Sequence, residues 1–178
     1  IYNGVLAGAD LSYEVDVWGR IRNMVSQSQD LAKASEADLA AATLSLHAML
    51  ASNYFSLRGA DEAQRILDTT VVAYQKALYL TKQRHSGGAS PIADVDKAAT
   101  QVENAKTLAA DNRLKRAQLE HAIAVLIGRF PADFSLPPAS LPPRFVTVAP
   151  DLPSTLLGRR PDIAAAELRV EAANANIG

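Results

Sequence analysis

Residues 39–81 read LAAATLSLHAMLASNYFSLRGADEAQRILDTTVVAYQKALYLT and carry a long helical repeat. Apolar, small or neutral polar side chains recur in this segment at alternating intervals of three and four residues, with two consecutive fours between Met49 and Leu57. Such spacing is typical of a helix face that packs along a second helix, and the two fours form a stutter that locally unwinds a supercoil. The stripe consists of Leu39, Ala42, Leu46, Met49, Asn53, Leu57, Ala60, Gln64, Leu67, Val71, Tyr74, Leu78 and Thr81.

The helix predicted from this stripe extends well beyond it on the N-terminal side. Between Arg20 and Arg84 the sequence has no proline and a single glycine, Gly59. A helix of that length measures roughly 95 Å at about 1.5 Å per residue, which is too long to be buried inside one small domain. We therefore expect a coiled-coil or tunnel-wall element. A second apolar set off the stripe indicates neighbours on both sides, as in the staves of a cylinder: Ala40, Leu44, Leu50, Tyr54, Ala73 and Ala77.

A turn is predicted at residues 85–90. Gly87 and Gly88 can adopt the left-handed conformation that ends a helix, and Ser90 followed by Pro91 is typical of a helix N-cap and first turn. His85, in the last turn of the long helix, is interpreted as a cation near the helix C-terminus.

A shorter helix is predicted to return from this turn over residues 91–127, beginning with the favourable first-turn charge of Asp94. It is about 40 Å shorter than the outgoing helix, so the predicted hairpin is lopsided. We interpret the basic group Arg113, Lys115 and Arg116 as a solvated helix face. The returning stripe consists of Ile92, Val95, Ala98, Val102, Ala105, Ala109, Asn112, Leu119, Ile123 and Leu126.

Seven of the nine prolines lie between Pro131 and Pro153, which predicts an irregular connector over residues 129–160. A further helix is predicted to begin at Pro161 and to occupy residues 161–178.

Within residues 1–19, the odd positions from Val5 to Val17 are apolar and the even positions beside them are glycine or polar, with Leu6 and Trp18 as exceptions, as in a β-strand with two different faces. A lone strand is unstable and must join a sheet. The pattern fits one strand of a membrane β-barrel, with Trp18 at its end, but alternation alone favours an edge strand on a soluble sheet. The polar face includes Asp10, Ser12, Glu14 and Asp16.

Composition excludes several functions. The 18 basic and 19 acidic residues give a net charge of −1, so no basic field indicates nucleic acid, and the absence of cysteine excludes thiolate chemistry and Cys-ligated metals. His47, His85 and His121 are far apart and lack partners at metal-ligand spacing. No catalytic or phosphate-binding motif occurs. We expect no enzyme activity, no cofactor and no metal site.

Four segments together resemble the TolC-like outer-membrane factors of tripartite efflux systems, and the nodulation-type lipoprotein branch in particular. They match the family's strand-exit motif, tip turn, returning helix and second-repeat opening. The segments are residues 13–20 (YEVDVWGR), 88–95 (GASPIADV), 116–128 (RAQLEHAIAVLIG), and 152–157 with 159–163 (LPSTLL and RRPDI).

The resemblance implies a mainly α fold: a long antiparallel α-helical hairpin over residues 20–128, preceded by a transmembrane β-barrel strand over residues 1–19. Residues 129–160 would be an equatorial connector, and residues 161–178 the start of a second repeat. Because family members hold two tandem repeats, we expect this chain to be an excerpt of a longer protein.

For function, the resemblance implies a passive homotrimeric duct that exports drugs or other small molecules across the periplasm and the outer membrane of a Gram-negative cell. The implied partners are a periplasmic adaptor (membrane fusion) protein, an inner-membrane RND transporter and outer membrane lipid, with no nucleic acid. The barrel lumen would be lined by Asp10, Ser12, Glu14 and Asp16. The adaptor would dock on a tip formed by Arg84, Gly87, Gly88, Ser90 and Asp94.

The alternative is a soluble periplasmic helical-hairpin adaptor or a coiled-coil scaffold. It explains the hairpin equally well, but it explains neither an amphipathic strand that leads into the helix nor the Arg159–Asp162 entry to a further helix.

Overall fold

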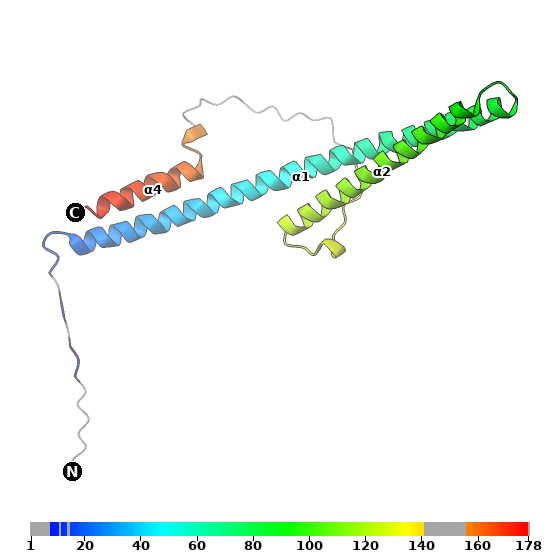
Figure 1. Ribbon diagram of the computed structural model, residues 1–178. Helices are drawn as coiled ribbons and strands as arrows, with labels where there is room; N and C mark the ends of the chain where they lie inside the picture. Colours follow the sequence, from blue (N-terminus) through cyan, green and yellow to red (C-terminus); the bar gives the residue numbers. More distant parts are fainter. Residues whose placement is uncertain (1–7, 11, 14, 141–155, 178) are drawn as a thin grey trace, which may run out of the picture. The chain divides into compact units, whose positions relative to one another are not determined.

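A computed structural model of the chain describes residues 8–10, 12, 13, 15–140 and 156–177 (Figure 1). The elements are the helices α1 (Arg20–Ser86), α2 (Ile92–Leu126) and α4 (Pro161–Ala175), and the 3-10 helix η1 (Pro131–Asp133). The prediction of a mainly α-helical chain with long helices is confirmed. The chain divides into unit 1 (Ile1–Thr43 with Ala149–Gly178) and unit 2 (Leu44–Val148), which are described separately below.

Helix α1 is continuous over 67 residues, about 100 Å at about 1.5 Å per residue. Its serine and threonine hydroxyls donate hydrogen bonds to the backbone carbonyls four residues earlier, at 2.8–3.0 Å. These bonds satisfy within the helix the hydroxyl groups that otherwise compete with helical structure. The residues concerned are Ser28, Ser35, Thr43, Thr69, Thr70 and Thr81.

The two helices of unit 2 end in the same way. At the end of α1, the Ala89 N–H donates to the Arg84 carbonyl at 2.8 Å, and Gly88 has a φ of +77°. At the end of α2, the Arg129 N–H donates to the Ala124 carbonyl at 2.8 Å, and Gly128 has a φ of +71°. Both ends are Schellman motifs, in which a left-handed residue lets the chain leave the helix while late carbonyls stay bonded.

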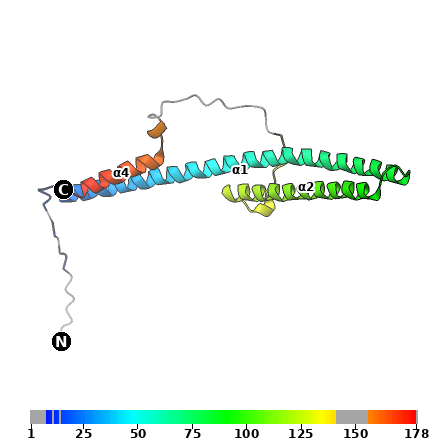
Figure 2. The same cartoon turned by 45° about the horizontal axis from the view of Figure 1, so that its top comes forward.

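In unit 2, α2 lies alongside α1 in both views of the molecule (Figures 1 and 2). The face of α1 toward α2 is the second half of the predicted stripe, where Leu57 is fully buried and Ala60 is 5% exposed. Opposite it, α2 buries mainly small residues, which bring the helix backbones close together. The buried apolar residues of α2 are Val95, Val102, Ala105, Ala109, Ile123 and Ala124.

The predicted stripe is not covered along its whole length. Leu39, Leu46 and Met49 are exposed, as is Ile92 at the start of α2. For Leu39 and Leu46 the reason is the unequal length of the two helices, because α2 has only 35 residues and cannot follow all of α1.

In unit 1, α4 packs beside the first part of α1 through alanines. Ala34 of α1 and Ala165 and Ala172 of α4 are at most 2% exposed. Arg169 forms an ion pair with Asp38 across this contact. Small side chains and the peripheral pair of Arg169 and Asp38 therefore contribute to this contact.

The predicted strand is not seen in the described residues of the N-terminal segment. Residues 8–10, 12, 13 and 15–19 lie outside helix and strand, and residues 1–7, Leu11 and Glu14 lie outside the described residues. A strand requires a hydrogen-bonded neighbour, which the described part of this chain does not supply. The barrel strand therefore stays a prediction.

Leu57→Ala tests the packing between α1 and α2. Truncation of a fully buried leucine removes apolar contact and leaves a cavity, so we expect the full-length protein to lose about 2–5 kcal/mol of unfolding free energy. Thermal or denaturant unfolding in detergent measures this loss. The control is Leu57→Met, which preserves volume and is expected to cost less than about 1.5 kcal/mol. Equal stability of wild type and Leu57→Ala would contradict the described packing.

Candidate functional site

Unit 2 carries two groups of polar side chains that come together from different elements. One lies at the turn between α1 and α2, and we call it the tip cluster: Arg84, His85, Ser90, Asp94 and Lys97. The other joins α1, α2 and the chain after η1, and we call it the charge cluster: Arg58, Asp61, Arg116 and Glu120.

The turn is held by two side-chain hydrogen bonds. The ring Nδ1 of His85 lies 2.8 Å from the Ser90 carbonyl oxygen, and the Ser90 hydroxyl donates to Asp94 Oδ2 at 2.9 Å. The prediction of Ser90 as the N-cap was wrong by one residue, since Pro91 holds that position without a side-chain cap. The Asp94 carboxylate, in the first turn of α2, attracts the hydroxyl instead.

Beside the turn lies a polar pocket of about 270 Å³ between the two helices. Thr81 and Arg84 line it from α1, and Asp94 and Lys97 line it from α2. Positive and negative groups thus share one small concavity, which suits a partner with polar side chains. Of the predicted tip residues, the structure places Arg84, Ser90 and Asp94 on this pocket, and Gly87 and Gly88 are exposed in the adjoining turn.

The charge cluster is a chain of ion pairs. Arg58 Nη1 donates to Asp61 Oδ2 at 2.8 Å, and Arg116 Nε donates to Asp61 Oδ1 at 2.6 Å. Arg116 Nη1 also donates to Glu120 Oε2 at 3.1 Å. Two guanidinium groups therefore face two carboxylates, and their formal charges balance.

The same side chains bind the backbone of residues 136–139, which follow η1. The Leu136 N–H donates to Glu120 Oε1 at 2.5 Å, and its carbonyl accepts from Arg116 Nη2 at 2.6 Å. The Pro137 carbonyl accepts from Arg58 Nη1 at 2.8 Å, and the Ala139 N–H donates to Asp61 Oδ2 at 3.1 Å. Side chains thus supply the hydrogen bonds that a neighbouring strand would otherwise give.

Burial and charge shape the ionisation of this cluster. Arg58 is 5% exposed and Asp61 is 9% exposed. Burial raises the pKa of Asp61, but hydrogen bonds from Arg116, the Ala139 N–H and Arg58 outweigh it and hold this pKa below its ordinary value. The Tyr54 ring centre lies 5.0 Å from the Arg58 guanidinium carbon. Interaction with the Tyr54 side chain raises the pKa of Arg58, burial lowers it, and the hydrogen bond to Asp61 raises it further, so that the net shift of this pKa is upward. Both shifts favour the charged forms of Arg58 and Asp61 near neutral pH.

The interpretation of Arg116 as part of a solvated patch was wrong, because its side chain is only 17% exposed. The returning stripe indicates that Arg116 lies on the packed face of the helix. The stripe has a gap between Asn112 and Leu119, and Arg116 fills it at intervals of four and three residues. A charged residue at a core position needs charged partners. Its partner Asp61 is far away in sequence, so spacing alone does not identify it.

At the start of α1, the carboxylate of Asp16 caps the helix. It accepts hydrogen bonds from the Ile21 and Arg22 N–H groups at 3.1 Å each and from Arg22 Nε at 3.2 Å. Partial burial raises the pKa of Asp16, but these hydrogen bonds outweigh it and lower the pKa. Of the other predicted lumen residues, Asp10 and Ser12 are exposed, and Glu14 lies outside the described residues.

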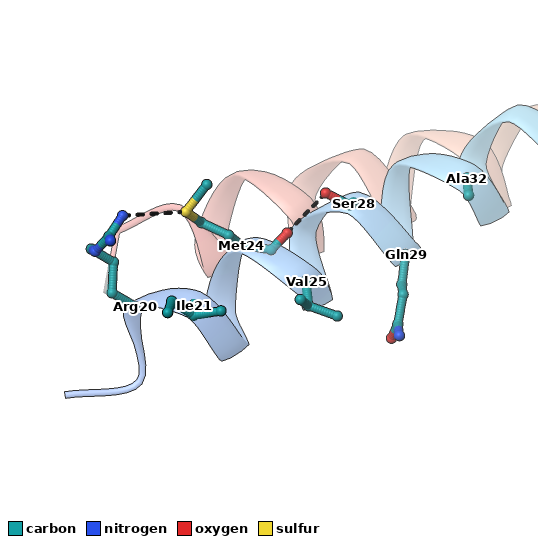
Figure 3. Close-up of a pocket in the computed structure, with 7 residues that line it drawn as sticks. All are labelled: Arg20, Ile21, Met24, Val25, Ser28, Gln29 and Ala32. Atoms are coloured by element: carbon teal, nitrogen blue, oxygen red, sulfur yellow. Dashed lines mark hydrogen bonds between the residues drawn. The ribbon is translucent and has the colours of Figure 1, made fainter. Parts of the chain in front are cut away.

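Directly after this cap, the first turns of α1 form an open apolar pocket of about 600 Å³ (Figure 3). The exposed side chains of Ile21, Met24 and Val25 line it, with Arg20 at one end. In Figure 3 Arg20 reaches back toward the Met24 sulfur, at 3.6 Å. Part of the surface beside the N-terminal segment is therefore apolar.

Among the described residues, no group of three or more His, Asp or Glu side chains is arranged to hold a metal ion. In the same part of the chain, no helix has an apolar stretch long enough to cross a membrane. The three histidines are separate: His85 lies at the tip, while His47 and His121 line two different pockets.

Comparisons with known proteins agree on one family. Residues 1–129 match the family described as outer membrane efflux protein. TtgC of Pseudomonas putida, named a probable efflux pump outer membrane protein, is 32% identical over 168 residues, 94% of this chain and 35% of TtgC. SilC of Salmonella typhimurium, named a probable outer membrane lipoprotein, is 30% identical over 175 residues, 97% of this chain and 38% of SilC.

Among solved structures, the outer-membrane channel OprN matches with a TM-score of 0.86 and 32% identity, over 91% of this chain and 37% of OprN. The chain thus spans little more than a third of the length of these relatives.

Asp61→Asn tests the charge cluster. The substitution removes the carboxylate shared by two buried guanidinium groups, so we expect the full-length protein to lose about 3 kcal/mol of unfolding free energy at pH 7. Chemical unfolding in detergent measures this loss. The matched control is Glu62→Gln, because Glu62 pairs only with the exposed Arg65 and its loss is expected to change stability little. Equal effects of the two substitutions would contradict the role of Asp61.

The depressed pKa of Asp61 gives the same comparison a pH dependence. A carboxylate with a lowered folded pKa contributes its full stability above the unfolded value, near 3.8, and loses it as the pH falls through the folded pKa. The stability difference between wild type and Asp61→Asn should therefore stay constant from pH 7 to about pH 4 and narrow only below that. Unfolding curves across this range provide the measurement, and a difference that narrows near pH 6 would contradict the assignment.

Proposed function

Because the chain belongs to the outer membrane efflux protein family, we propose that it is part of a channel subunit of a tripartite efflux pump. The complete protein would conduct drugs or other small molecules passively across the periplasm and the outer membrane. This chain would contribute one strand of the channel and one helical hairpin. The names of the relatives describe outer membrane components of efflux pumps, and we propose no catalytic role or cofactor.

The observation that carries this proposal is the unbroken 67-residue helix α1 with apolar side chains exposed along its length. The described neighbours of α1, α2 with 35 residues and α4 with 15 residues, leave much of this apolar surface uncovered. In the wall of a cylinder this exposed apolar surface would be covered, because each helix has neighbours on both sides. The exposed residues include Leu39, Leu44, Leu46, Met49, Phe55, Ile66, Val72, Tyr79 and Leu80.

We infer that the neighbours include other copies of the protein, arranged as a homotrimer. Residues 1–19 would form one strand of a barrel in contact with outer membrane lipid, with Asp10, Ser12, Glu14 and Asp16 toward the lumen. The opposite side of the strand would face lipid or neighbouring strands. In support, its apolar side chains are 66–91% exposed: Tyr13, Val15, Val17 and Trp18. The Asp16 cap would then fix the direction in which the strand enters α1.

Residues 20–128 would be the periplasmic hairpin, with the tip at residues 85–90 directed away from the membrane. Residues 129–160 would form the equatorial connector. Residues 161–178 would be the start of a second repeat. The similarity to TtgC and SilC covers nearly the whole chain but only 35–38% of those proteins, which leaves room in them for a further repeat.

The tip is the proposed docking site for a periplasmic adaptor that connects the channel to an inner-membrane RND transporter. The docking residues would be Arg84, Gly87, Gly88, Ser90 and Asp94. The polar pocket supports this assignment, because charges of both signs converge there from two helices. Gly87 and Gly88 would let an adaptor backbone approach closely, since neither has a side chain in the turn.

The alternative of a soluble hairpin adaptor or coiled-coil scaffold is disfavoured. The family match starts at residue 1 and includes the N-terminal segment, which such proteins have no reason to carry. The named relatives are outer membrane proteins.

Gly88→Leu in the full-length protein tests docking at the tip, with Gly128→Leu as the matched control. Both glycines have a φ near +70° to +80° with open space around the position of a Cβ, so each substitution carries a similar backbone cost of about 1–2 kcal/mol. Only Gly88 lies at the tip. We expect Gly88→Leu to raise drug susceptibility toward that of a deletion strain, while Gly128→Leu leaves susceptibility near wild type.

Immunoblots of the outer membrane fraction check that both variants reach the membrane as trimers. Wild-type susceptibility of Gly88→Leu at normal protein level would remove the docking assignment. If deletion of the gene changed susceptibility to none of the drugs tested, the proposal of an efflux function would itself be contradicted.

A further inference from the structure

The connector after η1 has an unusual set of bonding partners. Backbone groups of Leu136, Pro137 and Ala139 are bound by the side chains of the charge cluster, at 2.5–3.1 Å. Two of these side chains come from α1 and two from α2. Residues 136–139 are therefore hydrogen-bonded to both helices at once, by side chains that also form ion pairs with one another.

A fastening of this kind is specific in position. An apolar contact tolerates small shifts of the chain, whereas a hydrogen bond to a carboxylate or guanidinium weakens steeply with distance and angle. Buried ion pairs often add little net stability over an apolar contact, and their best-attested role is to fix register. The burial of Arg58 and Asp61 thus indicates positioning rather than added stability.

The polar contacts between α1 and α2 are concentrated near this cluster. Asn112 Nδ2 donates to the Ala60 carbonyl and to Gln64 Oε1, both at 2.9 Å, and Arg113 pairs with Asp68 at 2.9 Å. Together with the pair between Asp61 and Arg116, these contacts lie within two or three turns of each helix.

Between the pair formed by Asp68 and Arg113 and the turn itself, no side-chain hydrogen bond joins the two helices in the part of the chain that the structure describes. Val95, Val102, Ala105 and Ala109 supply the contact there. Small apolar surfaces slide at lower cost than ion pairs rearrange, because they lose no directional bond.

We propose that Arg58, Asp61, Arg116 and Glu120 are positioning residues that fasten the connector and fix the register of the hairpin at one level. Changes in the spacing of α1 and α2 are then confined to the side of Asp68 and Arg113 that faces the tip. This assignment concerns residues 136–139 and the two helices alone, so it is independent of the proposed function.

Hydrogen–deuterium exchange of the full-length protein, followed by mass spectrometry, tests the proposal. In the wild type, we expect peptides from residues 53–65 and 112–126 to exchange more slowly than peptides from residues 69–84 and 93–110. Uniform protection along the hairpin would overturn the confinement of motion to the tip side.

Two variants test the fastening. Within residues 134–140, we expect the Ala139 amide in Asp61→Asn and the Leu136 amide in Glu120→Ala to exchange at least about tenfold faster, the factor that a hydrogen bond to a charged group corresponds to. The matched control is Arg113→Gln, which breaks an exposed ion pair between the same helices without touching the connector, and it should leave residues 134–140 at wild-type rates.

A merely structural role gives a different result, because general loosening raises exchange over both helices together. Faster exchange across α1 and α2 in Asp61→Asn and Glu120→Ala, or wild-type rates at residues 134–140, would overturn the assignment. Drug-susceptibility assays on the deletion strain test the efflux function, whereas hydrogen–deuterium exchange tests the fastening of residues 136–139. A negative result in the first assay would leave the exchange result unchanged, so failure of the efflux proposal and failure of the fastening proposal can be told apart.

Discussion

A helix of 67 residues cannot bury its own apolar side chains, and this constraint governs the rest of the structure. Each part of α1 depends on a different neighbour: alanines of α4 pack on its beginning, and α2 packs on its later part. What these neighbours leave uncovered is apolar, including Leu44, Met49 and Phe55, which are 55–59% exposed. Exposed apolar surface on this scale marks an interaction site. The proposed function gives that surface a purpose, because in a channel wall each helix would have neighbours on both sides.

The sequence predicts the helical part well because its information is local and periodic. Alternating steps of three and four place Leu57 and Ala60 in the interface with α2, and Gly88 predicts the end of α1 from its conformational freedom. These features depend on residues within a few turns of each other, which is why a pattern in one chain is enough to find them.

The charge cluster shows where such reasoning stops. Asp61 finds its partners 55 and 78 residues away, at Arg116 and Ala139, and no spacing rule connects those positions. The N-terminal strand stays a prediction for a related reason, since a strand is completed by other strands and the described part of this chain contains none. The lumen assignment of Asp16 also depends on such partners, whereas its capping bonds to Ile21 and Arg22 are local.

The two glycines in the left-handed conformation, Gly88 and Gly128, bracket α2 with identical caps. Each cap is formed by the last turn of the helix that it closes and by the residues directly after that turn. A matched seven-residue insertion in α1 and α2 preserves the packing period and both caps while moving the turn outward by about 10 Å. The length of the hairpin can thus change in steps of seven residues while both helix caps stay the same. Proteins of this architecture can therefore match compartments of different depth without changes at either cap.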